Sequence, residues 1–83
     1  MDVNVLFFAR SRELAGVGDA LLQLSAGADT ASFIEELYRK YPSLEEIRGA
    51  FALAVNQEYL PAGEVATLKA GDEIAIIPPI SGG

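Results

Sequence analysis

A single amphipathic helix limits the folds that are open to this chain. The side chain of Asp29 or Thr30 can accept hydrogen bonds from the free amides at a helix start, and Pro42 ends the helix. Between these points, apolar residues recur at the i, i+3, i+4 and i+7 spacing of one helical stripe. The stripe consists of Ile34, Leu37, Tyr38 and Tyr41 and is widened by Phe33. One helix with one apolar stripe must be covered by a second layer, which the rest of the chain has to supply.

The polar face of this helix places acids and bases at matching positions. Glu35 with Arg39, and Glu36 with Lys40, are four residues apart with the acid nearer the N-terminus, which is the favourable orientation. Exposed pairs of this kind contribute roughly a few tenths of a kcal/mol each. We therefore predict two ion pairs on a solvated surface rather than an acid–base catalytic pair.

Five short segments have the composition of β-strands, because they are rich in β-branched, aliphatic and aromatic residues. They span residues 3–9, 19–24, 51–56, 59–60 and 73–77. Gly16 and Gly18 predict a turn between the first two strands, Asn56–Glu58 a tight hairpin, and Gly71 a turn with positive φ. Residues 10–16 fit one helical turn or a loop, and residues 43–50 are ambiguous between the same two.

These elements predict an α+β fold, the ubiquitin-like β-grasp, with one main helix on one face of a mixed five-stranded sheet. The first and last strands are the most apolar, so we place them side by side and parallel at the sheet centre. Residues 1–77 form the β-grasp domain, and residues 78–83 form an extended C-terminal tail. The boundary follows because Pro78 and Pro79 cannot donate to a sheet ladder.

The first strand is apolar on both faces. If Val3, Val5 and Phe7 face the core, the period of two places Leu6 and Phe8 on the opposite face, where one helix layer cannot cover them. The same alternation puts Ala75 and Ile77 of the last strand opposite Ile74 and Ile76. The uncovered side is explained either by a thick core or covering loop, or by a patch that binds a partner.

Composition excludes most catalytic chemistry. The 83 residues include no cysteine and no histidine, so disulfides, thiolate nucleophiles, imidazole bases and the usual zinc ligands are excluded, and no metal site is expected. The net charge of −6 would repel a phosphate backbone, which argues against nucleic acid and favours a protein partner with a basic or apolar surface. No apolar run is long enough for a membrane helix or a signal peptide, so we expect a soluble cytoplasmic protein.

The last six residues form an arm whose end is the candidate reactive group. Pro78, Pro79, Ile80, Ser81 and Gly82 lead to Gly83. Adjacent prolines favour an extended backbone, and the two terminal glycines have no Cβ, so a narrow channel could admit them. Nothing beside the terminal carboxyl group would hinder attack on it, and we take the Gly83 carboxyl as the candidate catalytic group.

The pattern resembles the ubiquitin-like sulfur carriers, and most closely the small subunits of molybdopterin synthase. The resemblance spans nearly the whole chain. It is carried by Leu6-Phe7-Phe8-Ala9, Arg12-Glu13-Leu14 with Gly16, Ala54-Val55-Asn56-Gln57, Gly71-Asp72-Glu73-Ile74-Ala75 and the closing Pro78-Pro79-Ile80-Ser81-Gly82-Gly83. The last of these is the most specific.

The resemblance implies a mechanism for the arm. A ubiquitin-activating-type adenylyltransferase transfers AMP from ATP to Gly83, and a persulfide sulfur donor converts the adenylate to a thiocarboxylate. The arm then threads into the large subunit of molybdopterin synthase, where the sulfur reaches a pterin precursor and helps to form a dithiolene. Catalytic side chains belong to the partners, no cofactor is held permanently, and the assembly is a heterotetramer of two small and two large subunits.

The resemblance also implies which residues contact the partners. Phe8, Tyr59 and Ile77 match the family's interface with the large subunit, and Leu6 lies beside them. Arg12 is a candidate contact for the activating enzyme. From the residues alone, Arg10 and Arg12 fit solvated loop positions, or ligands for a partner's carboxylates or a nucleotide phosphate.

Three other functions fit the same features. The thiocarboxylate could supply thiamine thiazole or transfer RNA thiolation, although the Phe-Phe-Ala run and the proline arm argue against thiazole. Gly83 could be joined to lysines of target proteins, as in ubiquitin, which would leave thiol-resistant conjugates on a denaturing gel. The chain could also be a plain binding module with an inert tail.

Overall fold

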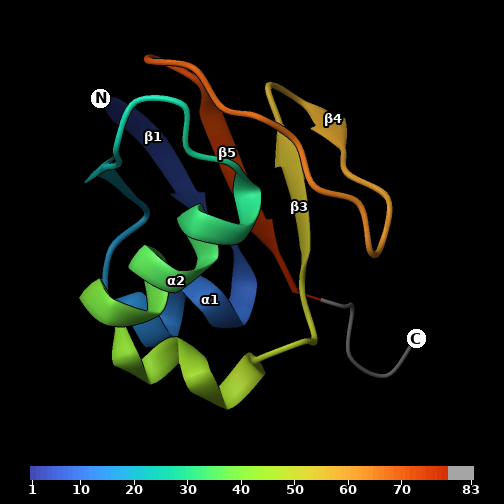
Figure 1. Ribbon diagram of the computed structural model, residues 1–83. Coiled ribbons are helices and arrows are strands. Elements are labelled where there is room, and N and C mark those ends of the chain that lie inside the picture. Colours follow the sequence, from blue (N-terminus) through green and yellow to red (C-terminus); the bar gives the residue numbers. More distant parts are fainter. Residues whose placement is uncertain (79–83) are drawn as a thin grey trace.

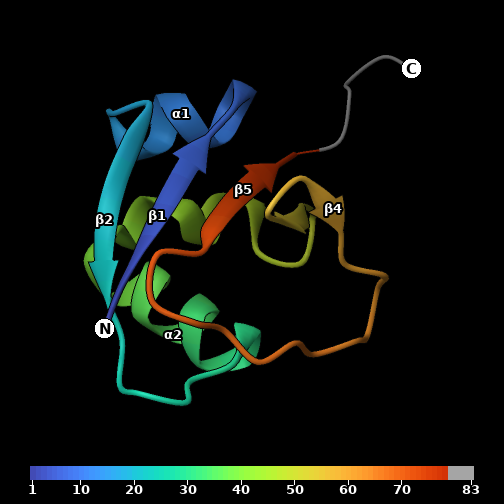
Figure 2. The same ribbon diagram turned by 90° about the horizontal axis from the view of Figure 1, so that it is seen from above.

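The sheet has the predicted five strands, with the two most apolar strands at its centre. The computed structural model describes residues 1–78. Its elements are β1 (Asp2–Phe7), α1 (Ala9–Ala15), β2 (Asp19–Gln23), α2 (Thr30–Lys40), the 3₁₀ helix η1 (Pro42–Ile47), β3 (Ala52–Val55), β4 (Glu58–Tyr59) and β5 (Glu73–Ile77). The strand order is β2-β1-β5-β3-β4. Strand β1 runs parallel to β5, whereas β2, β3 and β4 pair antiparallel with their neighbours (Figures 1 and 2). The predicted β-grasp fold is confirmed.

Helix α2 covers one face of the sheet and completes the core. Asp29 caps it by accepting a hydrogen bond from the Ser32 amide at 2.9 Å, as its position predicted. The stripe side chains Phe33, Leu37 and Tyr38 are buried. They pack with the inward residues of the central strands, namely Val3, Val5, Phe7, Ile74 and Ile76. The alternation predicted for β1 and β5 is therefore confirmed, and it leaves the other sheet face without a helix among residues 1–78.

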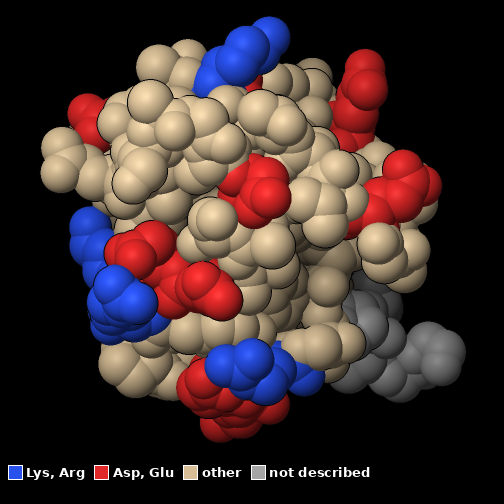
Figure 3. All heavy atoms as spheres, in the orientation of Figure 1, with Lys and Arg blue, Asp and Glu red and all other residues tan. Residues whose placement is uncertain are grey.

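The prediction of ion pairs on α2 is wrong, because Arg39 and Lys40 have other partners than the predicted ones. Arg39 pairs with Glu36 at 2.9 Å, three residues away, and no Glu35–Arg39 or Glu36–Lys40 pair is found within residues 1–78. Lys40 instead donates from Nζ to the carbonyl of Leu21 at 3.0 Å, because the edge strand β2 lies within its reach. Viewed from the α2 side, Figure 3 shows charges of both signs interspersed, as expected of a solvated surface.

The two ambiguous segments are both helical. Residues 10–15 lie in α1, and Gly16 caps its C-terminal end with φ of +81° and an amide that donates to the Arg12 carbonyl at 2.9 Å. Residues 42–47 form η1. The first strand is shorter than the predicted 3–9, because the chain turns into α1 directly after Phe8.

A buried carboxylate ties the β3–β4 turn to the start of β5. Asn56 and Gln57 form this turn with φ of +50° and +72°, the geometry of a tight hairpin. Asn56 Nδ2 donates to Asp72 Oδ1 at 3.0 Å, and the amide of Lys69 donates to Asp72 Oδ2 at 2.7 Å. These hydrogen bonds, with Asn56 the larger cause, lower the pKa of the Asp72 carboxyl below its ordinary 3.8.

We expect Asp72→Asn to lower the free energy of unfolding by about 1–2 kcal/mol at neutral pH, because a charge-assisted acceptor is lost. Because the folded-state pKa is lowered, the wild-type advantage is complete above the ordinary pKa of 3.8 and disappears as pH falls through the folded value. Urea unfolding at neutral pH and at a pH below the folded-state pKa of Asp72 measures the difference in stability. The exposed Asp19→Asn gives the same charge change as a control. A gap between Asp72→Asn and wild type that persists in acid would contradict this assignment.

Candidate docking face and the base of the C-terminal arm

Apolar residues of three central strands and the β4 edge share the sheet face opposite α2. In the strand register, Leu6 lies opposite Ala75, Ala75 opposite Ala54, and Ala54 opposite Tyr59, which makes one row across the sheet. Ile77 pairs with Ala52 in the next row. We call this surface the outer face, made of Leu6, Phe8, Ala52, Ala54, Tyr59, Ala75 and Ile77.

The outer face combines exposed aromatic rings with small buried residues. Phe8 is 48% exposed and Tyr59 69% exposed, while Leu6 and Ile77 are half-buried. Ala54 and Ala75 are buried between the larger side chains. No loop within residues 1–78 therefore buries Phe8, and the outer face is an apolar patch of the kind that proteins use for association.

Three further residues lie on the same side of the sheet as the outer face. The sequence did not predict them to belong to a site. Asp19 lies opposite Leu6, and Glu73 lies opposite Asn4, so acidic groups flank the apolar row. Leu21, opposite Asn4, is 60% exposed on the same side. Alternation in β2 could have identified Leu21, since the neighbouring Leu22 is buried.

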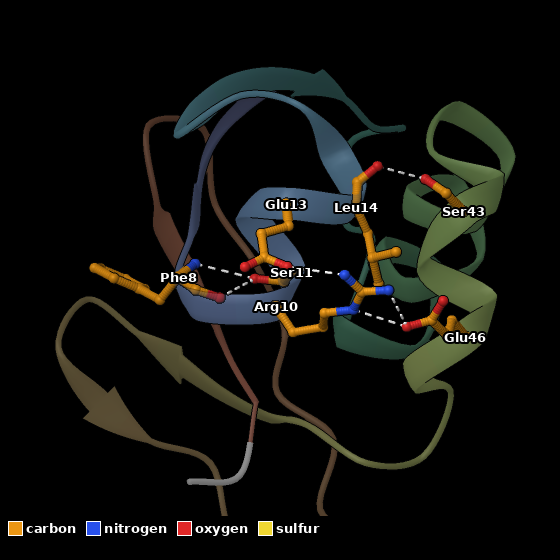
Figure 4. A network of polar contacts seen from close by, with 7 residues as sticks. All are labelled: Phe8, Arg10, Ser11, Glu13, Leu14, Ser43 and Glu46. Atoms are coloured by element: carbon orange, nitrogen blue, oxygen red, sulfur yellow. Dashed lines mark hydrogen bonds and ion pairs between the residues drawn. The ribbon is translucent and has the colours of Figure 1, made fainter. Parts of the chain in front are cut away.

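The structure separates the two arginines of α1. Arg10 forms ion pairs with Glu13 at 2.8 Å and with Glu46 of η1 at 2.6 Å, and both raise the Arg10 pKa (Figure 4). Arg12 is exposed and has no ion pair with any residue in 1–78. Its guanidinium lies over Gly18, where a Cβ would be 3.4 Å from Arg12 Cζ. Arg12 is therefore placed on a helix and not on the outer face.

The arm starts from the same side of the molecule. Strand β5 ends at Ile77, and Pro78 is buried directly after it. The remaining predicted arm positions lie outside the described residues, and these are Pro79, Ile80, Ser81, Gly82 and Gly83. The four predicted interface residues Leu6, Phe8, Tyr59 and Ile77 thus come together, and the last of them immediately precedes the arm.

Neither a metal cluster nor a membrane helix is found in the described part of the chain. No group of three or more acidic, histidine or cysteine side chains within residues 1–78 could hold a metal ion. No helix there is both long and apolar enough to cross a membrane.

Comparison with known proteins identifies the family. The family model described as the ThiS family matches residues 5–83. The chain belongs to the ThiS family. Among its relatives, the molybdopterin synthase sulfur carrier subunit of Arabidopsis thaliana is 48% identical over 83 residues, covering 100% of this chain and 84% of the relative. The subunit of the same name in Chlamydomonas reinhardtii is 42% identical over 83 residues, with 100% of both chains covered.

Solved structures of similar proteins share the fold. SAMP1 from Haloferax volcanii matches with a TM-score of 0.86 and 27% identity over 100% of both chains. A putative molybdopterin converting factor subunit 1 from Pyrococcus furiosus matches with a TM-score of 0.82 and 32% identity, covering 96% of this chain and 99% of that one. In Helicobacter pylori, a chain of the complex between subunits 1 and 2 of molybdopterin-converting factor matches with a TM-score of 0.71 and 25% identity over 100% of both chains.

Proposed function

We propose that this chain is the sulfur carrier subunit of a molybdopterin synthase. In this function Gly83 is adenylated, converted to a thiocarboxylate, and donates its sulfur to a pterin precursor to form the molybdopterin dithiolene. The observation that carries the proposal is the outer face, an apolar patch whose last residue, Ile77, is also the base of the Gly-Gly arm. The same function is supported by the relatives named as sulfur carrier subunits, whose matches cover the whole length of this chain.

The chemistry of the arm requires partners to activate it. A terminal carboxyl has an ordinary pKa of roughly 3.5, so at neutral pH the Gly83 group is a carboxylate and a poor electrophile. Adenylation by an ATP-dependent adenylyltransferase makes AMP the leaving group, and the outer sulfur of a persulfide donor displaces AMP to form an acyl disulfide. A thiol reductant then cleaves the S–S bond, which leaves the thiocarboxylate on Gly83 and a disulfide on the donor side. The chain has no histidine or cysteine to act as base or sulfur donor, so these groups belong to the partners.

Docking of the outer face on the large subunit would direct the arm into that subunit. Phe8 and Tyr59 supply exposed aromatic anchors, and aromatic side chains are frequent hot spots of interfaces. The acidic neighbours Asp19 and Glu73 favour a partner surface with basic residues around an apolar centre. The Helicobacter pylori complex of subunits 1 and 2 supports a large-subunit partner.

The proposal is tested by the mass of the intact chain after incubation with the adenylyltransferase, ATP, a persulfide donor and a thiol reductant. Loading is expected to add the mass difference between sulfur and oxygen at the C-terminal carboxyl. The loaded chain, mixed with the large subunit and the pterin precursor, should return to its original mass as molybdopterin forms. A chain that never gains this mass would overturn the proposal.

A second candidate function is covalent modification of other proteins through Gly83. It is favoured by the similarity to SAMP1, since a related solved structure is called small archaeal modifier protein 1. Conjugation would produce species of higher mass that resist thiol reagents on a denaturing gel. The carrier function produces none, so the same cell extract distinguishes the two.

We expect Arg12→Ala to slow loading of the arm about tenfold, because a guanidinium can supply charge-assisted hydrogen bonds to the activating enzyme. Affinity for the large subunit should not change, since Arg12 lies on α1 rather than on the outer face. Arg10→Ala is the matched control, because Arg10 is already engaged by Glu13 and Glu46. Equal loading rates for Arg12→Ala and Arg10→Ala would refute the role of Arg12.

A further inference from the structure

A buried serine hydroxyl fixes the corner between β1 and α1. Ser11 is fully buried, at 0% exposure. The amide of Phe8 donates to Ser11 Oγ at 3.0 Å, and Oγ donates back to the carbonyl of Phe8 at 2.6 Å (Figure 4). Both backbone polar groups of Phe8 are therefore held by one side chain.

The same hydroxyl lies against the strand that leads to the arm. Ser11 Oγ is 3.4 Å from the carbonyl of Ile76, the residue before Ile77. The single hydroxyl proton goes mainly to Phe8, since 2.6 Å is the shorter distance, and the contact with Ile76 is weak. The hydrogen bonds to Phe8 therefore hold the corner, and the contact with Ile76 places it beside the end of β5.

Backbone strain at the neighbouring residue shows that the corner has to be held. Ala9 has φ of +51°, a region that residues with a Cβ rarely adopt. Within residues 1–78, the other non-glycine residues with positive φ are Asn56 and Gln57, whose hairpin turn requires it. Ala9 lies in no such turn. Strained conformations persist where their surroundings enforce them, and they concentrate at functional sites.

The corner determines where the Phe8 ring points. Phe8 has an extended backbone, with φ of −122° and ψ of 152°, so it continues the alternation of β1 and its ring lies on the outer face. Figure 4 shows the ring pointing away from α1. Without the Ser11 hydroxyl, the strain at Ala9 can relax by rotation of the Phe8–Ala9 backbone, and the ring would leave its place.

We propose that Ser11 is a positioning residue for docking on the large subunit, acting through Phe8. Its hydroxyl holds the strained corner so that the Phe8 ring is oriented on the outer face before the partner arrives. This role rests on the proposed function, because it requires that the outer face binds the large subunit. Preorganisation of an anchor raises affinity by reducing the ordering that binding would otherwise require.

A purely structural role predicts different results. Ser11 also stabilises the first turn of α1, and loss of such a cap lowers protein stability without changing the affinity of an intact surface. The two roles are separated by measuring both melting temperature and affinity in a double-mutant cycle with Phe8.

The cycle compares wild type, Ser11→Ala, Phe8→Ala and the double variant, with the affinity for the large subunit measured by calorimetry. Ser11→Ala is expected to weaken binding about tenfold in the wild-type background and to have no further effect once the Phe8 ring is removed. Ser43→Ala is the matched control, since Ser43 Oγ donates to the Leu14 carbonyl at 2.6 Å and anchors the other end of α1. It should lower the melting temperature and leave affinity unchanged.

The proposal would be overturned if the Ser11→Ala chain binds as tightly as wild type. It would also be overturned if Ser11→Ala reduces the affinity by the same factor with and without the Phe8 ring.

If Ser11→Ala does not fold, the same comparison is made in an Ala9→Gly background. Glycine adopts positive φ without strain, so the fold should survive loss of the hydroxyl, but its backbone is also freer, and only the Ser11 hydroxyl then holds the Phe8 ring in place. Ala9→Gly with Ser11→Ala should then bind several-fold more weakly than Ala9→Gly alone, and equal affinities would refute the role. A wild-type chain that does not bind the large subunit would overturn the proposed function itself.

Discussion

Deletion of Gly83 is expected to abolish sulfur loading while leaving the affinity for the large subunit within a few-fold of wild type. The shortened chain still ends in a glycine carboxylate, that of Gly82, so its chemistry is unchanged. The carboxyl is only displaced, by about 3.3 Å for one extended residue. Since misplacement of a reacting group by about 1 Å can reduce a rate about 100-fold, we expect no detectable thiocarboxylate in the intact mass.

Gly83→Ala is the matched variant, because it keeps the length of the arm and adds only a Cβ beside the carboxyl group. Loading should be slowed but measurable, since the Cβ crowds the channel without moving the carbonyl carbon. Docking should be unchanged in both variants, because the outer face is intact. Normal loading of the chain without Gly83 would show that sulfur is carried elsewhere and would end the proposed mechanism.

The sequence predicted those features that depend on local periodicity. The stripe at Phe33, Leu37 and Tyr38 identified α2, and the period of two in β1 placed Leu6 and Phe8 on the outer face. Side-chain direction in a helix or strand follows from position along the chain, so these predictions needed no knowledge of tertiary contacts.

Contacts between distant segments could not be predicted in this way. Arg10 and Arg12 were indistinguishable in the sequence, and they differ because Glu46, 36 residues from Arg10, is brought to one of them. The corner at Ala9 was also missed, because a positive φ at an alanine has no sequence signal comparable to that of glycine. The role of Ser11 became visible only with the hydrogen bonds that it makes to Phe8.

Ile77→Asp is expected to weaken binding to the large subunit by at least about 100-fold, which corresponds to roughly 3 kcal/mol. Ile77 is half-buried on the outer face and pairs with Ala52 in the sheet. A carboxylate at this position would have to be desolvated against an apolar partner surface, and it would add to the acidic charge of this side. The expected result is loss of co-purification with the large subunit, and calorimetry would give the size of the effect.

Folding should survive the change, because Ile77 is at the end of β5 and its side chain lies outside the main core. We expect a cooperative melting transition and a stability loss of about 1 kcal/mol, the range of strand-propensity differences. Val65→Asp is the control, since Val65 is 59% exposed and lines a groove with Thr30 and Ile34 of α2. It makes the same chemical change on the helix side and should bind normally. If Ile77→Asp binds as well as Val65→Asp, the outer face is not the docking surface, and the arm must be delivered by another part of the molecule.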